Sequence, residues 1–330
     1  MNKLLKALGA LALLIATAVV GAQTPTTLRV IVFPGAVNIP LFVGMEEGIF
    51  AKHGIQVSLQ NTPDSDTVRN GLAAGQYDIA HATADNAIAM IETAGQDARI
   101  VMGGDYGLVQ IMARKDIRTF ADLRGKVLAV DAPNTAYALV AKKILKLNGL
   151  LEGRDYTVRP AGGTLQRAQA MVANPELAVG MLNAPFSITV RDQGLKSLGE
   201  ARSFIGPYQA TSAFVMRPWA EAHADALERY IAAYIESVRI AMSPAHKQAT
   251  LDMLVARFKL DAAVAKETLD QLMTPGFGLA PDARLDLDGL RTVLALRAEI
   301  QGQWAGQPPA PDKFVDLRYY DRALLRLGTR

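Results

Sequence analysis

The sequence contains no cysteine among its 330 residues. Without a thiol, the chain can form no disulfide, no thiolate metal site and no cysteine nucleophile, and it offers no attachment point for a lipid behind an export signal. Its stability must therefore come from a hydrophobic core. With 50% hydrophobic residues, the chain is long enough to build one large α/β unit or two lobes.

The chain also lacks a strong excess of charge and is poor in aromatic residues. The 35 Lys and Arg residues are nearly balanced by 32 Asp and Glu residues, and only 6% of the chain is aromatic. No dense basic patch with interleaved aromatic residues is present, so nucleic acid is not an expected partner.

Recognisable catalytic motifs are absent as well. The sequence contains no G-x-S-x-G elbow, no G-x-x-x-x-G-K phosphate loop and no G-x-G-x-x-G. The four histidines, His53, His81, His223 and His246, are too far apart for metal-ligand spacing. Only His81 falls at a predicted strand end, where a buried or capping histidine is the simpler interpretation than a general base. We therefore expect no catalytic residue, no metal and no cofactor.

Residues 1–22 predict a cleavable signal peptide. Lys3 and Lys6 precede an apolar run from Leu8 to Val20, and small residues lead to a cleavage site after Ala22. The alternative, a retained membrane helix, would need about 20 apolar residues. We expect the mature chain to be a soluble periplasmic protein that is not lipid-anchored, because no cysteine follows the signal.

Strand-like and helical segments alternate through the first two thirds of the chain, a pattern typical of parallel sheets covered by helices. The segment 28–33 is rich in β-branched residues, and 55–60 alternates strictly between apolar and polar residues. From Trp219 onward the pattern is helical. Apolar residues from Leu227 to Met242 recur on one helical face.

Five predicted strands end in small residues together with Asn, Asp or Thr. Each such residue alone is explained as a helix cap. In open α/β sheets, however, ligands bind beyond the carboxyl ends of the strands, so the coincidence favours a site for a small polar molecule. Asp85 and Asp105 could accept from an amine, whereas the helix N-termini near Asn38 and Thr135 could hold an oxyanion. These alternatives predict different ligands. The segments are 34–40, 83–86, 103–106, 131–137 and 183–186.

The segment from Pro40 to Ile55, PLFVGMEEGIFAKHGI, closely resembles the type 2 periplasmic binding proteins of ABC importers, in their nitrate, sulfonate, taurine and thiamine-pyrimidine-precursor branch. The resemblance implies an α/β fold of two lobes, each a mainly parallel sheet flanked by helices, with a ligand cleft between them. It places lobe 1 at residues 23–113 and 212–330 and lobe 2 at 114–211. It continues through 69–79, 83–86, 122–127, 130–133, 162–164 and 181–186.

The resemblance implies a monomeric receptor that closes about a hinge over a small organic solute and delivers it to the membrane subunits of an ABC permease. The loops carry no Arg or Lys, which favours a neutral or amine-bearing ligand, with a heteroaromatic ring stacked on Phe186 or Tyr208 as one option. A sulfonate or related anion is the alternative. The expected contacts are Asn38, Thr83, Asp85, Asn86 and Asp105 from lobe 1, and Asn134, Thr135, Asn183, Phe186 and Tyr208 from lobe 2.

An enzyme on the same fold is the alternative function, because pyrimidine-precursor synthases and some menaquinone-pathway enzymes resemble these binding proteins. Such a role needs reactive side chains, and this sequence offers only His81 near the predicted cleft. We therefore expect a binding protein rather than an enzyme.

Overall fold

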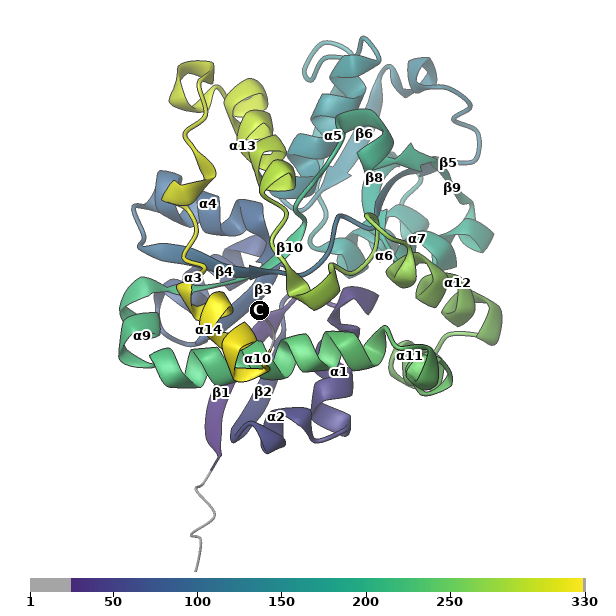
Figure 1. The fold of residues 1–330 in the computed structure, drawn as a ribbon. Helices are drawn as coiled ribbons and strands as arrows, with labels where there is room; N and C mark the ends of the chain where they lie inside the picture. Colours follow the sequence, from purple (N-terminus) through teal and green to yellow (C-terminus); the bar gives the residue numbers. More distant parts are fainter. Residues whose placement is uncertain (1–24, 329–330) are drawn as a thin grey trace, which may run out of the picture.

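The computed structural model describes residues 25–328, and its core is two five-stranded sheets flanked by helices (Figure 1). The first sheet has the order β2-β1-β3-β10-β4. Its strands pair in parallel except β10, which is antiparallel to both neighbours. The strands are β1 (Thr26–Val32), β2 (Ile55–Asn61), β3 (Ile79–Thr83), β4 (Ala98–Gly103) and β10 (Thr211–Met216).

The second sheet has the order β7-β6-β8-β5-β9, and here β5 is the antiparallel strand. We call the parts built on the first and second sheets lobe 1 and lobe 2. Two mainly parallel sheets flanked by helices confirm the predicted fold class. The strands are β5 (Val109–Arg114), β6 (Lys126–Val130), β7 (Tyr156–Pro160), β8 (Leu177–Asn183) and β9 (Leu195–Glu200).

Helices cover both sheets. Lobe 1 carries α1 (Ile39–Glu46), α2 (Ile49–Lys52), α3 (Ser65–Ala73), α4 (Ala84–Ala94), α9 (Arg217–Ala222), α10 (Ala224–Ala241) and α14 (Arg318–Arg326). Lobe 2 carries α5 (Ala136–Leu147), α6 (Thr164–Ala173), α7 (Phe186–Thr189) and α8 (Ala201–Ile205). A C-terminal segment adds α11 (Lys247–Phe258), α12 (Ala262–Met273) and α13 (Leu287–Gln301).

The chain crosses between the sheets twice. It leaves the first sheet after β4 and enters the second at β5, so the first crossing lies at residues 104–108. The sequence places this crossing near Arg114, but β5 belongs to the second sheet because its backbone pairs with β8 and β9. The chain returns between α8 and β10, close to the predicted Thr211.

The C-terminal segment contacts both lobes, although the sequence assigned residues 212–330 to lobe 1. Helix α13 packs against α5, where Lys143 and Lys146 bind Glu299 at 2.6 and 2.9 Å. Helix α12 packs against α7, and Arg191 of lobe 2 binds Glu267 at 2.7 Å. Helical periodicity does not reveal which partner a face will cover, so these contacts were not predictable.

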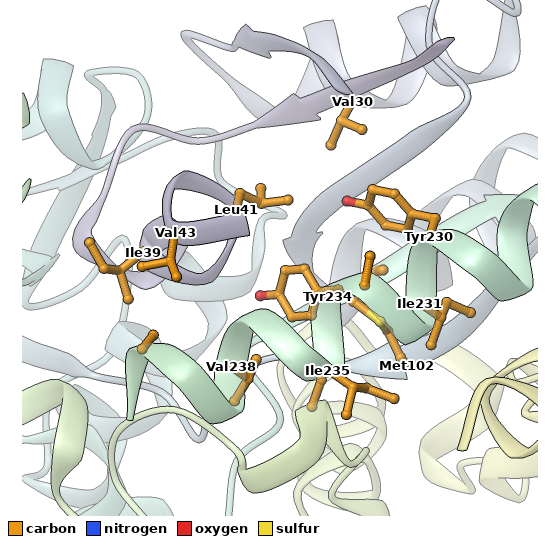
Figure 2. Packing of buried hydrophobic residues seen from close by; sticks show 14 of the residues in the cluster. Val30, Ile39, Leu41, Val43, Met102, Tyr230, Ile231, Tyr234, Ile235 and Val238 are labelled. Carbon is orange, nitrogen blue, oxygen red and sulfur yellow. The ribbon is translucent and has the colours of Figure 1, made fainter. Parts of the chain in front are cut away.

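Helix α10 forms the centre of the lobe 1 core, and its apolar face is the one predicted from the sequence. Its residues pack against β1 and α1, as Figure 2 shows. Tyr230, Tyr234 and Ile235 are almost completely buried, and Ser237 fills the position beside Gly44 of α1. A side chain at Gly44 would collide with Ser237 and Phe50, so glycine permits the close approach of the two helices. Among residues 25–328, no helix is both long and apolar enough to cross a bilayer.

Candidate functional site

A pocket lies between the two sheets, where the carboxyl ends of the parallel strands face each other. The empty space within it is about 550 Å³, including the part that opens to solvent. Lobe 1 lines it with Phe33, Pro34, Val37, Asn38, Ser65, His81, Ala82, Thr83 and Thr211, and lobe 2 with Asp131, Thr135, Ala136, Tyr137, Gly163, Thr164, Arg167 and Asn183.

The two lobes touch each other around this pocket. The Gly163 amide of lobe 2 donates to the Pro63 carbonyl of lobe 1 at 2.7 Å, and the Ser65 amide of lobe 1 donates to Asp131 Oδ2 at 3.1 Å. A β-carbon at Gly163 would lie 2.9 Å from both Phe33 and the Pro63 oxygen. The contact between the lobes therefore depends on a residue without a side chain at this position.

Arg167 is a buried cation in the wall of the pocket, in the first turn of α6. Its guanidinium donates to the Met181 carbonyl at 2.9 Å, the Gly162 carbonyl at 2.7 Å and Thr164 Oγ1 at 3.3 Å. Among the described residues it forms no salt bridge, although its side chain is only 2% exposed. Burial lowers its pKa to about 10, so it stays protonated at neutral pH.

Arg167 lies inside α6 and does not directly follow a strand, so the pattern of polar residues at strand ends does not indicate it. The sequence nevertheless contains an indication of Arg167, which is its position near the start of a helix. An arginine near the start of a helix opposes the helix dipole. Arg167 comes four residues after Gly163, so one helical turn returns its side chain toward the loop that begins α6. A cation in that position is costly unless an anion compensates it.

Asp131 brings a carboxylate to the same pocket. Its oxygen Oδ2 accepts the Ser65 amide hydrogen from the opposite lobe. Burial raises the pKa of Asp131, while the Ser65 hydrogen bond and the positive charge of Arg167 oppose that rise. The carboxylate is thus shared between holding the lobes together and facing the pocket.

Asn183 and Tyr137 complete the polar wall of lobe 2. Asn183 is 8% exposed, and its side-chain oxygen Oδ1 is buried and has no hydrogen-bond partner in the described part of the chain. Burial raises the pKa of Tyr137, and a hydrogen bond from the Asn183 side chain partly opposes this rise. An acceptor buried without a partner costs free energy, so Oδ1 is available to a donor that enters the pocket.

His81 lies at the lobe 1 side of the pocket, and its ring contacts residues of the lobe 1 core. Its Nε2 is 2.8 Å from the Tyr230 hydroxyl, and its ring lies 4.9 Å from that of Tyr234. Burial lowers its pKa to about 3. The imidazole is therefore neutral and weakly basic at neutral pH, which confirms the interpretation of His81 as a buried histidine.

Four of the ten residues proposed from the sequence line the pocket, namely Asn38, Thr83, Thr135 and Asn183. Asn38 is held in place because its amide donates to the Phe33 carbonyl at 2.7 Å. Thr83 accepts a hydrogen bond at 3.0 Å from Asn86, which itself does not line the pocket. Helices α5 and α6 contribute residues of their N-terminal turns to the pocket lining. The backbone amides at these helix ends have no partner inside the helix, so they favour a negative charge nearby.

Asp85 and Asp105 do not line the pocket, because other residues of the chain satisfy their carboxylates. Asp85 binds Arg297 of α13 at 2.6 Å, and both side chains are almost completely buried. Asp105 accepts the amides of Gly107 at 2.8 Å and Thr211 at 3.2 Å. It thereby joins the two crossings between the lobes, and its burial raises its pKa.

The remaining three candidates lie elsewhere. Tyr208 is buried beside the first crossing, against Gly107. Phe186 packs on an apolar cluster inside lobe 2, and Asn134 lines a separate groove with α3 and α4. Neither Phe186 nor Tyr208 is therefore placed to stack on a molecule in the pocket. Within residues 25–328, no group of three or more His, Asp or Glu side chains could hold a metal ion.

Comparison with known proteins gave one family and many solved structures. The family model described as "ABC transporter, phosphonate, periplasmic substrate-binding protein" matches residues 40–265. No protein among the curated sequences matches the chain.

Three of the similar structures illustrate the likeness in fold. The periplasmic nitrate-binding protein NrtA from Synechocystis PCC 6803 has 15% identity and a TM-score of 0.76, over 92% of this chain and 89% of that one. The alkanesulfonate-binding protein SsuA from Xanthomonas axonopodis pv. citri, bound to MOPS, has 17% identity and a TM-score of 0.69, over 87% and 96%. A zinc-bound ligand-binding component of an ABC-type import system from Staphylococcus aureus has 14% identity and a TM-score of 0.73, over 90% and 99%.

Proposed function

Because the chain belongs to the family of periplasmic substrate-binding proteins of phosphonate ABC transporters, we propose that it captures a small organic solute with an acidic group between its lobes. It then delivers that solute to an ABC permease. Arg167 is the observation that carries this proposal, since it is a buried guanidinium that lines the pocket and forms no salt bridge within residues 25–328.

An oxyanion is the chemical group that suits this site. A buried charge is costly unless it is paired and hydrogen-bonded. Three of the five guanidinium N–H groups of Arg167 are used by the protein, which leaves two for a ligand. The N-terminal turns of α5 and α6 add partial positive charge at the same wall. The nitrate and alkanesulfonate named for two structural neighbours are anions as well.

This proposal revises the ligand expected from the sequence. A neutral or amine-bearing solute was favoured because no cation appeared in the loops at the strand ends. Arg167 removes that premise, because it reaches the pocket from one turn inside α6. The alternative of a sulfonate or related anion therefore becomes the stronger one.

The proposed binding cycle uses closure of the two lobes about their crossings. Opening would hydrate Arg167 and break the hydrogen bonds from Gly163 to Pro63 and from Ser65 to Asp131. An acidic solute pairs with Arg167 only where water is excluded, so it favours the closed form. That form is the one offered to the permease. We place the mature protein, as a monomer released after cleavage of residues 1–22, in the periplasm; those residues lie outside the described part of the chain.

The enzyme alternative has no specific support in the pocket. Its only histidine, His81, is held by Tyr230 and has a pKa of about 3. A base this weak does not remove protons from ordinary substrates near neutral pH. The family and the three neighbours described above are transport binding proteins.

A thermal-shift screen followed by calorimetry tests the proposal. The panel contains alkylphosphonates, alkylsulfonates and carboxylates, each with and without an amine, together with neutral aminopyrimidines. We expect at least one acid to raise the melting temperature, because a ligand at 100 times its Kd adds about 2.7 kcal/mol to the free energy of unfolding. Stabilisation by neutral compounds alone would contradict the proposal.

A further inference from the structure

Part of the C-terminal segment is attached to both crossings between the lobes. Residues 261–301 contain α12, α13 and the loop between them, and we call this part the strap. Its loop binds the first crossing, where the Ala280 amide donates to the Gly104 carbonyl at 2.9 Å. Its helix α13 begins beside the second crossing, where the Asp286 amide donates to Gln209 Oε1 at 2.8 Å. The strap is therefore fixed to the residues about which the lobes would turn.

A buried ion pair ties the strap to lobe 1. Arg297 of α13 binds Asp85 of α4 at 2.6 Å, and the two side chains are only 1% and 2% exposed. Separating these two charges inside the protein would leave each of them desolvated and unpaired, which is costly. In addition, Leu269 and Leu272 of α12 belong to the same hydrophobic cluster as residues of α1 and α10. These contacts hold the strap on lobe 1.

Exposed ion pairs connect the strap to lobe 2. Glu299 of α13 accepts from Lys143 and Lys146 of α5, and Glu267 of α12 accepts from Arg191, which follows α7. The side chains of these five residues are 23–47% exposed. Figure 1 shows α13 beside α5 and α12 beside α7. Because water solvates such groups once they separate, these pairs break and re-form at a low cost in free energy.

Lobe 2 and the strap carry opposite excess charges. In both groups of ion pairs the cation belongs to lobe 2 and the carboxylate to the strap. Residues 109–206 of lobe 2 contain 14 Lys and Arg against 8 Asp and Glu, whereas the strap contains 7 Asp and Glu against 4 Lys and Arg. The two therefore attract each other beyond the paired residues, and this attraction weakens as salt is added.

Resting on the binding cycle proposed above, we propose that the strap is an electrostatic latch that stabilises the closed form. The pairs at Glu299 and Glu267 break when lobe 2 moves away from the strap, and they re-form when it returns. The buried pair between Asp85 and Arg297 stays intact in both forms. The latch thus sets the closed fraction of the solute-free protein, and a larger closed fraction raises the apparent affinity for a solute that binds the closed form.

Distances between the lobes of the solute-free protein test the latch without reference to any solute. The chain has no cysteine, so Asn61→Cys in lobe 1 and Gln169→Cys in lobe 2, both at exposed positions, place one spin label on each lobe. Pulsed electron paramagnetic resonance then measures the distance between the labels. Raising NaCl from about 0.01 M to about 1 M shortens the Debye length from about 30 Å to about 3 Å. We expect this change to raise the ratio of open to closed protein at least about threefold.

The variant Glu267→Gln/Glu299→Gln, in the same labelled protein, removes both carboxylates of the latch and keeps the size of the side chains. We expect about fivefold more open relative to closed protein at low salt, and little further change at high salt. Asp270→Asn is the matched control, because Asp270 binds Lys266 of the same helix at 2.6 Å and joins no second lobe. This control should match the unaltered protein. Identical distance distributions for the double variant and the unaltered protein at both salt concentrations would overturn the latch, whether or not acids of the solute panel bind.

Discussion

Replacing Asp85 should destabilise the fold without weakening solute binding. The sequence suggested Asp85 as a ligand contact, but its carboxylate binds Arg297 Nη1 at 2.6 Å, with side-chain exposures of 2% and 1%. Arg297 also donates from Nε to Gln303 at 2.9 Å. The variant Asp85→Ala would leave this arginine buried without its counter-charge.

The magnitude follows from that burial. Breaking a buried ion pair by removing one partner costs about 3–5 kcal/mol, because the other charge stays desolvated. The exposed pair Lys266–Asp270 has the same separation, 2.6 Å, with side chains 66% and 48% exposed. Loss of such a pair costs about 1 kcal/mol or less. Asp270→Ala is thus a matched control for the removal of a carboxylate.

Urea unfolding of the wild type and both variants provides the assay, with the Kd for the solute measured in parallel. We predict that Asp85→Ala lowers the urea concentration at the unfolding midpoint and that Asp270→Ala hardly changes it. The Kd for the solute should be unchanged in both variants under conditions where the protein is folded. The double variant Asp85→Leu/Arg297→Met should recover much of the lost stability. Reduced affinity with normal stability would show that Asp85 contacts the solute and that the assignment to a structural ion pair is wrong.

Two further predictions concern closure and pH. Gly163→Val should keep the fold but weaken solute binding, because its β-carbon would lie 2.9 Å from Phe33 and Pro63 and would hold the lobes apart. Small-angle scattering of this variant should therefore show no compaction when solute is added. Compaction of the variant on addition of solute would refute this prediction. His81 has a folded pKa of about 3 against 6.5, so its contribution to stability is present above pH 6.5 and is lost as pH falls. The free energy of unfolding should decrease by about 2 kcal/mol from pH 7 to pH 5 through this residue. Urea unfolding of His81→Gln at the same two pH values should not show this decrease in the free energy of unfolding.

Local patterns were enough to predict the lobes and part of the pocket. Strand alternation, the apolar face of α10 and the polar residues at strand ends are short-range features, and they led to the α/β fold and to Asn38, Thr83, Thr135 and Asn183. The small residues at these strand ends also reflect how closely the lobes approach each other.

Two of the failures share one physical cause, which is distance along the chain. Asp85 finds its partner Arg297 212 positions later, so capping rules could not distinguish a ligand contact from an ion pair. The strand β5 was placed in the wrong lobe because its pairing with β8 is a long-range contact. Arg167 was not predicted for a different reason, since it lies in the first turn of α6 rather than in a loop that follows a strand.

Binding of the best acidic solute to Arg167→Gln tests the central claim most directly. Arg159 of the same lobe forms an exposed pair with Glu176, so Arg159→Gln is the matched control. We predict that calorimetry will show an affinity at least about 30-fold lower for Arg167→Gln, as expected when one partner of a buried charge pair is removed, and no change for Arg159→Gln. An unchanged Kd in a folded Arg167→Gln protein would contradict the claim that this guanidinium holds the solute.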